Sequence, residues 1–246
     1  MLIDRTQAEV FAWHTRPGAF ARLGPPWENV RAETRGAGIG NGSRVVLKSK
    51  IGPVWTRWEG EHFGYRENEI FCDRQIEGPF KSWVHRHRFE SDATGGCWLI
   101  DEIDYELPWG MIGSVGVRYV ERRLDRLFRY RHVMTKTDLE LRAARCGRAL
   151  ISGASGMIGR ALIDFLRTQG WAVDLLVRRE VKAAREISWN PSADLVAWPK
   201  GYHCDAVIHL AGANIADGRW APPPPPAFRN QEQLRRRHAH VDQRDP

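Results

Sequence analysis

The chain has 246 residues, of which 42% are hydrophobic and 27% are charged, and its formal net charge is +7. This length allows one large or two modest domains, each with its own buried core. The positive charge is spread along the chain and forms no basic stripe beside a nucleic-acid motif, which excludes nucleic acid as a predicted partner. The sequence does not decide the oligomeric state.

The expected cellular compartment is inferred from features that the sequence does not contain. No uncharged run approaches the ~20 residues of a membrane span, and the N-terminus has no apolar signal-peptide core. Cys72, Cys97, Cys146 and Cys204 form no Cys-x-x-Cys pair. Reduced thiols in a cytoplasmic protein without a membrane span are therefore predicted.

The first part of the chain predicts two short helices, a sheet and a long helix. Apolar positions over residues 4–23 have helical spacing, and Pro17-Gly18 divides them into two pieces. From Gly36 to Pro108 the period is two, which predicts antiparallel strands with turns at 52–53, 67–68, 78–79 and 95–96. A helix is expected over 115–135. This order is typical of a helix-grip α+β domain, in which the last helix closes a cavity over the sheet.

Alternation within the sheet predicts a polar cluster in that cavity. Successive strand residues point to opposite faces, so one face of two neighbouring strands holds Trp83, His85, His87, Phe89, Asp101 and Tyr105. Three interpretations stay open: a structural hydrogen-bonded cluster, a site that orients a polar ligand head group, and a two-His, one-carboxylate metal site. No further metal ligand is evident, so the sequence assigns no metal.

A glycine turn organises the second part of the chain. Apolar strands are expected over 148–152, 171–177 and 205–210, and a helix ending at Gly170 follows the first strand. Between that strand and helix, glycines at three-residue spacing permit a tight turn and close approach to a pyrophosphate. The predicted cofactor-binding residues are Gly153, Ala154, Ser155, Gly156, Met157, Ile158, Gly159, Leu210, Ala211 and Gly212.

Two arginines indicate whether the predicted dinucleotide is NADP or NAD. Arg178 and Arg179 stand at the end of the second strand, where NAD-specific enzymes tend to hold an acid for the ribose 2′-hydroxyl. Guanidinium groups favour a 2′-phosphate, so we predict NADP in preference to NAD. The alternative is that they are solvated charges closing a strand. Residues 187–198 are expected to form a small hairpin or an irregular connection.

Both parts resemble known families. Gly-Ala-Ser-Gly-Met-Ile-Gly, Leu-Val-Arg-Arg, and His-Leu-Ala-Gly-Ala-Asn-Ile followed by Arg219-Trp220 resemble the epimerase-like branch of the extended short-chain dehydrogenase/reductases. Trp83-x-His-x-His-x-Phe89, with Asp73 to Phe80 and Asp101 to Pro108, resembles the SRPBCC (START-like) domains. These resemblances imply an NAD(P)-binding Rossmann-type domain and a cavity for a hydrophobic small molecule.

The resemblance to the reductases also implies a catalytic Tyr-x-x-x-Lys pair, and the sequence contains none. After Trp220 the chain is rich in proline and arginine, which predicts disorder and a truncated or frame-shifted reading. We therefore predict a helix-grip domain over 1–146, an incomplete α/β Rossmann-type domain over 147–220 and a tail over 221–246. The predicted function is an NADP-binding, epimerase-like oxidoreductase, catalytically incomplete in this chain; the alternative is a non-catalytic binding protein acting through the helix-grip domain.

Overall fold

Two sheets organise the described residues. The computed structural model describes residues 1–35, 38–51, 54–108, 114–141 and 146–212. We call residues 1–141 the N-terminal region and residues 146–212 the C-terminal region. The predicted tail 221–246 and the Arg219-Trp220 motif lie outside the described residues.

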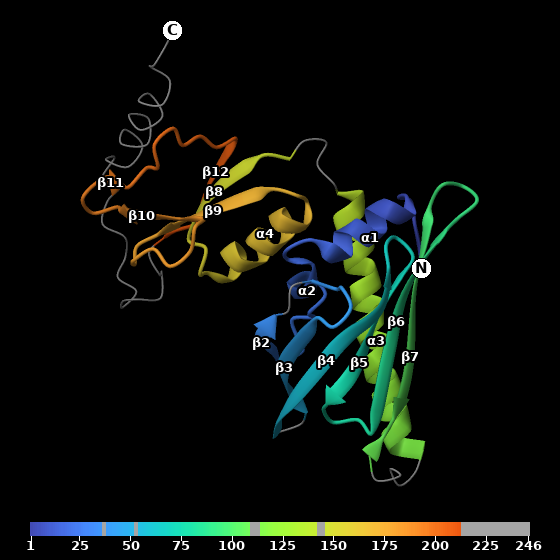
Figure 1. The fold of residues 1–246 in the computed structure, drawn as a ribbon. Helices are drawn as coiled ribbons and strands as arrows, with labels where there is room; N and C mark the ends of the chain where they lie inside the picture. The colour runs from blue at the N-terminus through green and yellow to red at the C-terminus, as the bar shows by residue number, and fades with distance from the viewer. Residues whose placement is uncertain (36–37, 52–53, 109–113, 142–145, 213–246) are drawn as a thin grey trace, which may run out of the picture. The chain divides into compact units, whose positions relative to one another are not determined.

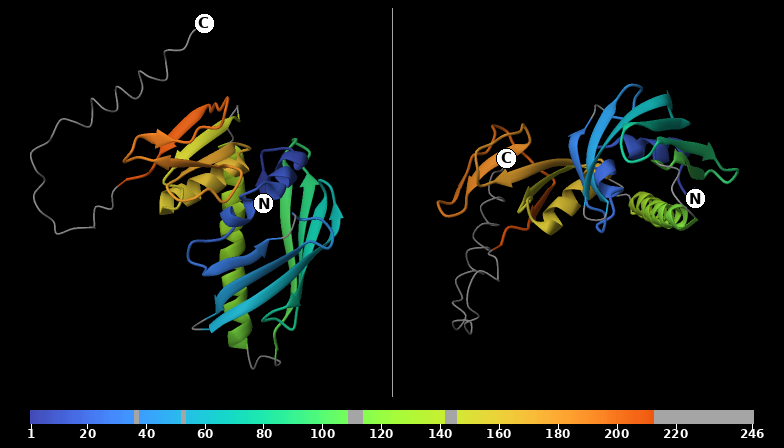
Figure 2. Two further views of the ribbon diagram at one scale, coloured as in Figure 1. Left: turned by 60° about the vertical axis from the view of Figure 1, so that its left-hand side comes forward. Right: turned by 90° about the horizontal axis from the view of Figure 1, so that it is seen from below.

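The N-terminal region is a curled, seven-stranded antiparallel sheet with the order β1-β7-β6-β5-β4-β3-β2 (Figure 1). The long helix α3 (Ser114–Glu140) lies along the concave side of this sheet (Figure 2). This is the predicted helix-grip arrangement. The strands are β1 (Leu2–Ile3), β2 (Val30–Arg35), β3 (Arg44–Ile51), β4 (Val54–Arg66), β5 (Ile70–Glu77), β6 (Ser82–Ser91) and β7 (Cys97–Glu106).

The sheet is larger than predicted, because it begins before Gly36. β1 pairs with β7, and β2 pairs with β3. β1 was not predicted because a strand of two residues is too short to show alternation of polar and apolar residues. β2 reads Val-Arg-Ala-Glu-Thr-Arg, and its single apolar branched residue gives little sign of a buried face.

The two short predicted helices are confirmed as α1 (Gln7–Thr15) and α2 (Ala19–Arg22). Thr6 and Glu9 form a capping box that satisfies backbone donors at the start of α1. Pro17 cannot continue a helix, and Gly18 adopts φ +98°, a left-handed conformation that favours glycine. The break in the sequence pattern therefore corresponds to a real change of chain direction.

The helix α3 extends past the predicted end at Thr135 to Glu140. Its last turns carry polar residues that are nevertheless buried, namely Thr135 and Asp138, together with Leu139. The Asp138 carboxylate accepts two hydrogen bonds from the Arg22 guanidinium, at 2.6 and 2.9 Å. Burial of a carboxylate depends on such a partner, which a search for apolar periodicity does not detect.

The core of the N-terminal region contains ten buried residues. Phe11 contacts Phe71 and Phe89 edge to face, with ring centroids 6.2 and 5.1 Å away. Each fully buried large apolar side chain contributes roughly 1.5–3 kcal/mol. The members are Ile3, Val10, Phe11, Trp13, Ala19, Phe71, Phe89, Cys97, Leu99 and Leu139.

The C-terminal region is a sheet with the order β11-β10-β9-β8-β12, in which β10, β9, β8 and β12 run parallel. The helix α4 (Met157–Thr168) connects β8 to β9 and ends before Gly170, whose φ is +89°, as predicted. The strands are β8 (Arg148–Ser152), β9 (Ala172–Val177), β10 (Glu186–Asn190), β11 (Leu195–Val196) and β12 (Ala206–His209).

The predicted small hairpin is formed by β10 and β11, but β10 also pairs in parallel with β9. The pairing of β10 with β9 was not predicted. Its residues alternate between polar and apolar, with Ile187 buried, whereas a parallel strand is ordinarily apolar on both faces.

Hydrogen bonds join residues of the two regions. The Arg16 guanidinium donates to the carbonyl oxygen of Thr168 at 2.6 Å, and the Gln169 amide donates to the carbonyl oxygen of Asp138 at 2.7 Å. No helix among the described residues combines the length and apolar character that crossing a membrane requires.

Candidate functional site

The glycine turn between β8 and α4 is packed against the end of β12. Gly153 has φ +73°, and a Cβ at this position would lie 2.5 Å from the carbonyl carbon of Leu210. A Cβ at Gly159 would overlap the carbonyl oxygen of Gly153. Both positions thus require glycine, one for conformation and close approach and the other for helix packing.

The start of α4 presents backbone donors without a side-chain acceptor. Gly156 is the N-cap, no side chain caps this end, and no acidic residue lies in the first turn. The positive end of the helix dipole and the first N–H groups therefore stand uncapped beside the glycine turn. Met157 and Ile158 are 85% and 63% exposed there. This arrangement is suited to an anion such as a phosphate.

Two distant segments meet at this turn. The backbone N–H of Leu210 donates to the carbonyl oxygen of Ser152 at 3.2 Å, and the N–H of Ala211 donates to the Ser152 hydroxyl at 3.4 Å. The Ser152 hydroxyl also lies 2.7 Å from Nδ1 of His209. The structure therefore brings Leu210 and Ala211 to the predicted turn at Gly153. Nothing in the sequence pattern indicated that Ser152 and His209 would link them.

The two predicted 2′-phosphate arginines differ in their surroundings. Arg179 makes a two-pronged ion pair with Glu186 of β10, with distances of 2.9 and 2.5 Å. This pairing holds the pKa of the Glu186 carboxyl at about 2. Arg178 is exposed and has no polar partner within the part of the chain that the structure describes. Of the two guanidiniums, that of Arg178 is the one available to a ligand.

A cluster of imidazoles and carboxylates lies on the concave face of the N-terminal sheet. Asp73 stands opposite His85 in the pairing of β5 with β6, and His87 stands opposite Asp101 in the pairing of β6 with β7. Oδ1 of Asp101 lies 2.8 Å from Nε2 of His85 and 2.8 Å from Nδ1 of His87. The predicted meeting of two imidazoles and a carboxylate is therefore present.

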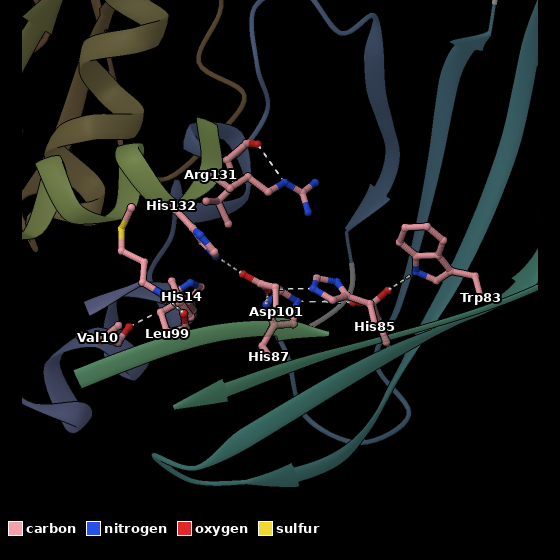
Figure 3. Close-up of polar contacts among 12 residues, drawn as sticks. Val10, His14, Trp83, His85, His87, Leu99, Asp101, Arg131 and His132 are labelled. Carbon is pink, nitrogen blue, oxygen red and sulfur yellow. Dashed lines mark hydrogen bonds and ion pairs between the residues drawn. The ribbon is translucent and has the colours of Figure 1, made fainter. Parts of the chain in front are cut away.

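Helix α3 and a further strand extend this cluster. Nε2 of His132, on α3, lies 2.6 Å from Oδ2 of Asp101, so Asp101 is held from both sides (Figure 3). Oδ2 of Asp73 lies 3.1 Å from Nδ1 of His85, and the Trp83 indole N–H donates to Oδ1 of Asp73 at 3.3 Å. We call Asp73, His85, His87, Asp101 and His132 the His-Asp cluster.

The cluster favours ionised carboxylates. Burial opposes ionisation of Asp101, but His87, His132 and His85 outweigh it and hold its pKa well below the usual range. Burial likewise opposes ionisation of Asp73, and hydrogen bonds from His85 and His87 lower its pKa. Burial favours a neutral His85, yet its bonds to Asp101 and Asp73 raise its pKa overall. Interactions with the imidazoles therefore stabilise the two negative charges.

The other predicted cavity residues are placed differently. Phe89 is 2% exposed and belongs to the apolar core. Trp83 and Tyr105 pack around Phe80, with ring centroids 4.9 and 5.6 Å from it. A shallow, open hollow of about 420 Å³ along β6 and β7 includes one predicted residue, Tyr105. Its lining is Ser82, Val84, Ile103, Asp104, Tyr105 and Glu106.

Sequence reasoning missed Asp73 and His132 as members of the cluster. Asp73 could have been found from strand pairing, because a hairpin turn at Gly78-Pro79 places β5 beside β6. His132 stands four residues after Phe128, on the same helical stripe. Phe128 contacts His85 edge to face at 5.0 Å, so that stripe does face the cluster.

Comparison with known proteins agrees with the sequence resemblance. Residues 149–237 match the model of the NAD dependent epimerase/dehydratase family. An epimerase family protein of Mycobacterium leprae (strain TN) is 38% identical over 79 residues, which are 32% of this chain and 26% of the relative. One from Mycobacterium bovis is 39% identical over 71 residues, 29% of this chain and 24% of that protein. The second part of this chain thus carries an epimerase-family domain.

A solved structure matches both regions of the chain. The nucleoside-diphosphate sugar epimerase from Corynebacterium glutamicum is 27% identical, with a TM-score of 0.63, over 87% of this chain and 45% of that one. This match supports the predicted fusion of a helix-grip domain to an epimerase-family domain. The chain spans less than half of that structure's chain and about a quarter of the curated relatives.

Proposed function

We propose that the C-terminal region binds NADP in a Rossmann-type site and serves an epimerase-like oxidoreductase function, fused to a ligand-binding helix-grip domain. The observation that carries this proposal is the glycine turn, where Gly153 approaches the backbone just after β12 and Gly159 packs under the turn. Beside it, the uncapped start of α4 supplies N–H donors and a positive dipole for a pyrophosphate. The epimerase-family match covers this same segment.

Different residues would bind different parts of the cofactor. Residues 153–159 would receive the pyrophosphate, and 210–212 would let the β12 backbone approach it closely. Arg178 would bind the 2′-phosphate that distinguishes NADP from NAD, while Arg179 stays paired with Glu186. A bound nicotinamide supplies hydride transfer. The residues named here would hold the pyrophosphate and the 2′-phosphate of that cofactor.

We further propose that these 246 residues bind the cofactor without completing a catalytic site. None of the five tyrosines is followed four residues later by lysine, so the pair that would lower the tyrosine pKa and move a proton is not supplied. Purified protein should therefore bind NADPH and show no oxidoreductase turnover with nucleotide sugars.

Titration with NADPH, followed by nicotinamide fluorescence, tests the binding proposal. We expect saturable binding at one equivalent per chain, and weaker binding of NADH. The variant Gly156→Asp places a negative charge at the N-cap of α4 and should reduce NADPH affinity by roughly tenfold or more, a ~1.4 kcal/mol effect. Gly40→Asp, in open space in the N-terminal region, is the matched control. Absence of NADPH binding to folded protein would refute the proposal.

A second candidate function is binding of a hydrophobic small molecule by the helix-grip domain alone. The His-Asp cluster favours it, because polar groups beneath α3 could orient a head group. If so, a conservative Asp101→Asn variant should remain folded and lose binding of an apolar fluorescent probe. Equal probe binding by both proteins would count against the second candidate.

A further inference from the structure

Three ligand-type atoms of the His-Asp cluster converge on one point. Oδ2 of Asp73 lies 3.1 Å from Nδ1 of His85 and 3.6 Å from Nε2 of His87. All three lie within 4.8 Å of one another. A tetrahedral zinc site with bonds of ~2.0–2.1 Å separates its ligand atoms by about 3.3 Å. The two distances from Asp73, 3.1 and 3.6 Å, are close to this separation.

Hydrogen bonding on the far side of each imidazole determines what faces this point. An ionised carboxylate only accepts hydrogen bonds, so Asp101 requires protons on Nε2 of His85 and Nδ1 of His87. In neutral imidazoles the remaining nitrogens, Nδ1 of His85 and Nε2 of His87, then carry lone pairs. The Asp73 carboxylate faces both of these nitrogens, so either protons on the rings or one metal ion must lie between them.

The surroundings match those of ligated metals. Histidine ligands ordinarily donate their second N–H to a carboxylate, which fixes the ring and raises its basicity. Here Asp101 fills that role for both rings and is itself held by His132. The Trp83 indole orients the second oxygen of Asp73. The nearby Arg131 donates from Nε to the Leu23 carbonyl oxygen, and no bond from it to Asp73 is seen among the described residues.

We propose that Asp73, His85 and His87 bind a divalent metal ion of the zinc class, with Asp101 as the positioning residue. Two imidazole nitrogens and one carboxylate oxygen suit zinc and its first-row neighbours, and not magnesium or calcium, which take all-oxygen sites. Three protein ligands leave a fourth position for water. The site is 3–13% exposed at its three side chains, so the ion is held inside the domain.

This proposal departs from the sequence analysis, which assigned no metal. The reason is the third ligand. Sequence alternation placed Asp101 with the two histidines, but the structure shows Asp101 behind the rings and Asp73 in front of them. Asp73 enters only through the pairing of β5 with β6.

The experiment uses the full chain, stripped of metal with a chelator and titrated with Zn²⁺ alone against a chromophoric competitor. We expect one equivalent of zinc per chain and a zinc-dependent rise in the unfolding temperature. His87→Ala and Asp73→Asn should each weaken zinc binding by about 100-fold or more. Asp101→Asn should weaken it by ~10–100-fold, the usual effect of a group that orients ligands. His203→Ala removes an exposed imidazole elsewhere and should change nothing.

The wild-type protein alone can overturn the proposal, so it does not depend on the variants folding. If folded wild-type protein does not bind zinc at micromolar concentrations, the proposal is wrong, and hydrogen bonds alone join the imidazoles to Asp73. Binding that persists in both His87→Ala and Asp73→Asn would place the ion elsewhere. Cobalt substitution adds a spectroscopic check, because a thiolate charge-transfer band would assign the metal to a cysteine and refute the site.

Discussion

The candidate site of the N-terminal region is made of side chains, whereas that of the C-terminal region depends on backbone and on glycines that have no side chain. In the N-terminal region, the His-Asp cluster consists of side chains held on three strands and a helix. In the C-terminal region, the glycine turn works because side chains are absent where Gly153 and Gly159 meet backbone. The first kind of site is broken by removing a side chain, and the second is broken by adding one.

Their cores differ as well. Among the described residues, the main apolar cluster of the N-terminal region has ten buried members, whereas that of the C-terminal region has three, Ile151, Ile163 and Val173, packed by partly buried side chains. The edge strand β12 leaves Val207 66% exposed. An edge strand with an apolar exposed residue has unpaired backbone groups and little packing on that side. The C-terminal region is therefore expected to open more readily.

Limited proteolysis tests that difference in stability. We expect cleavage after Arg148 to be about 1000-fold faster than cleavage within β4–β7, equivalent to ~4 kcal/mol in opening free energy. A resistant fragment should end near residue 145. Added NADPH should slow the cleavage if the glycine turn binds it. Equal protection of both regions without nucleotide would contradict the comparison.

The variant Asp101→Leu should be the most damaging single substitution in the His-Asp cluster. It leaves His85, His87 and His132 without their acceptor, and breaking a buried charged network costs about 3–5 kcal/mol. Chemical denaturation of metal-free protein measures it. Asp104→Leu, on the exposed face of the same strand, loses only the pair with Arg86 and should cost at most ~1 kcal/mol. If the two variants lose the same free energy of unfolding, the His-Asp cluster does not stabilise the region more than an exposed ion pair does.

Adding one methyl group at Gly153 should break the C-terminal site. Gly153→Ala combines a strained positive φ with a backbone overlap, so we expect a loss of about 2–4 kcal/mol and of NADPH binding. Gly201 also has a positive φ, +69°, but nothing within 4 Å of an added Cβ. Gly201→Ala should thus cost only ~1–2 kcal/mol and keep NADPH binding, which separates strain from overlap.

The difference between the two arginines can be measured through cofactor preference. Arg178→Ala should narrow the gap between NADPH and NADH affinity by about 1–3 kcal/mol, the scale of a charge-assisted hydrogen bond. Arg179→Ala should have a smaller effect, because its guanidinium is already paired with Glu186. Equal affinity for both nucleotides in the unmutated protein would refute the 2′-phosphate assignment.

The smallest expected effect concerns Tyr202, whose hydroxyl donates to the buried Asp174 at 3.0 Å. Tyr202→Phe should cost about 1 kcal/mol at neutral pH. Burial and this hydrogen bond raise the pKa of Tyr202 above its ordinary value. Its contribution is therefore complete below pH 10 and declines above it, as the unfolded tyrosine ionises. The stability difference between the two proteins should shrink as the pH rises above about 10; a constant difference there would contradict this assignment.

Much of the local structure could be predicted from the sequence, because it depends on neighbours along the chain. Two-residue alternation identified the inward faces of β6 and β7, and with them the meeting of His85, His87 and Asp101. Glycine spacing identified the turn before α4, since a turn is specified by the few residues that form it. Proline and glycine divided α1 from α2 for the same reason.

Only the tertiary structure decided which separate segments meet. Strand order joined Asp73 to the histidines, the rotation of α3 brought His132 to Asp101, and the pairing of β10 with β9 engaged Arg179 with Glu186. Parallel pairing of β8 with β12 carried Leu210 to Gly153. Each contact depends on register between elements far apart in the chain. Register is fixed by packing of the whole sheet, which no local pattern of residues records.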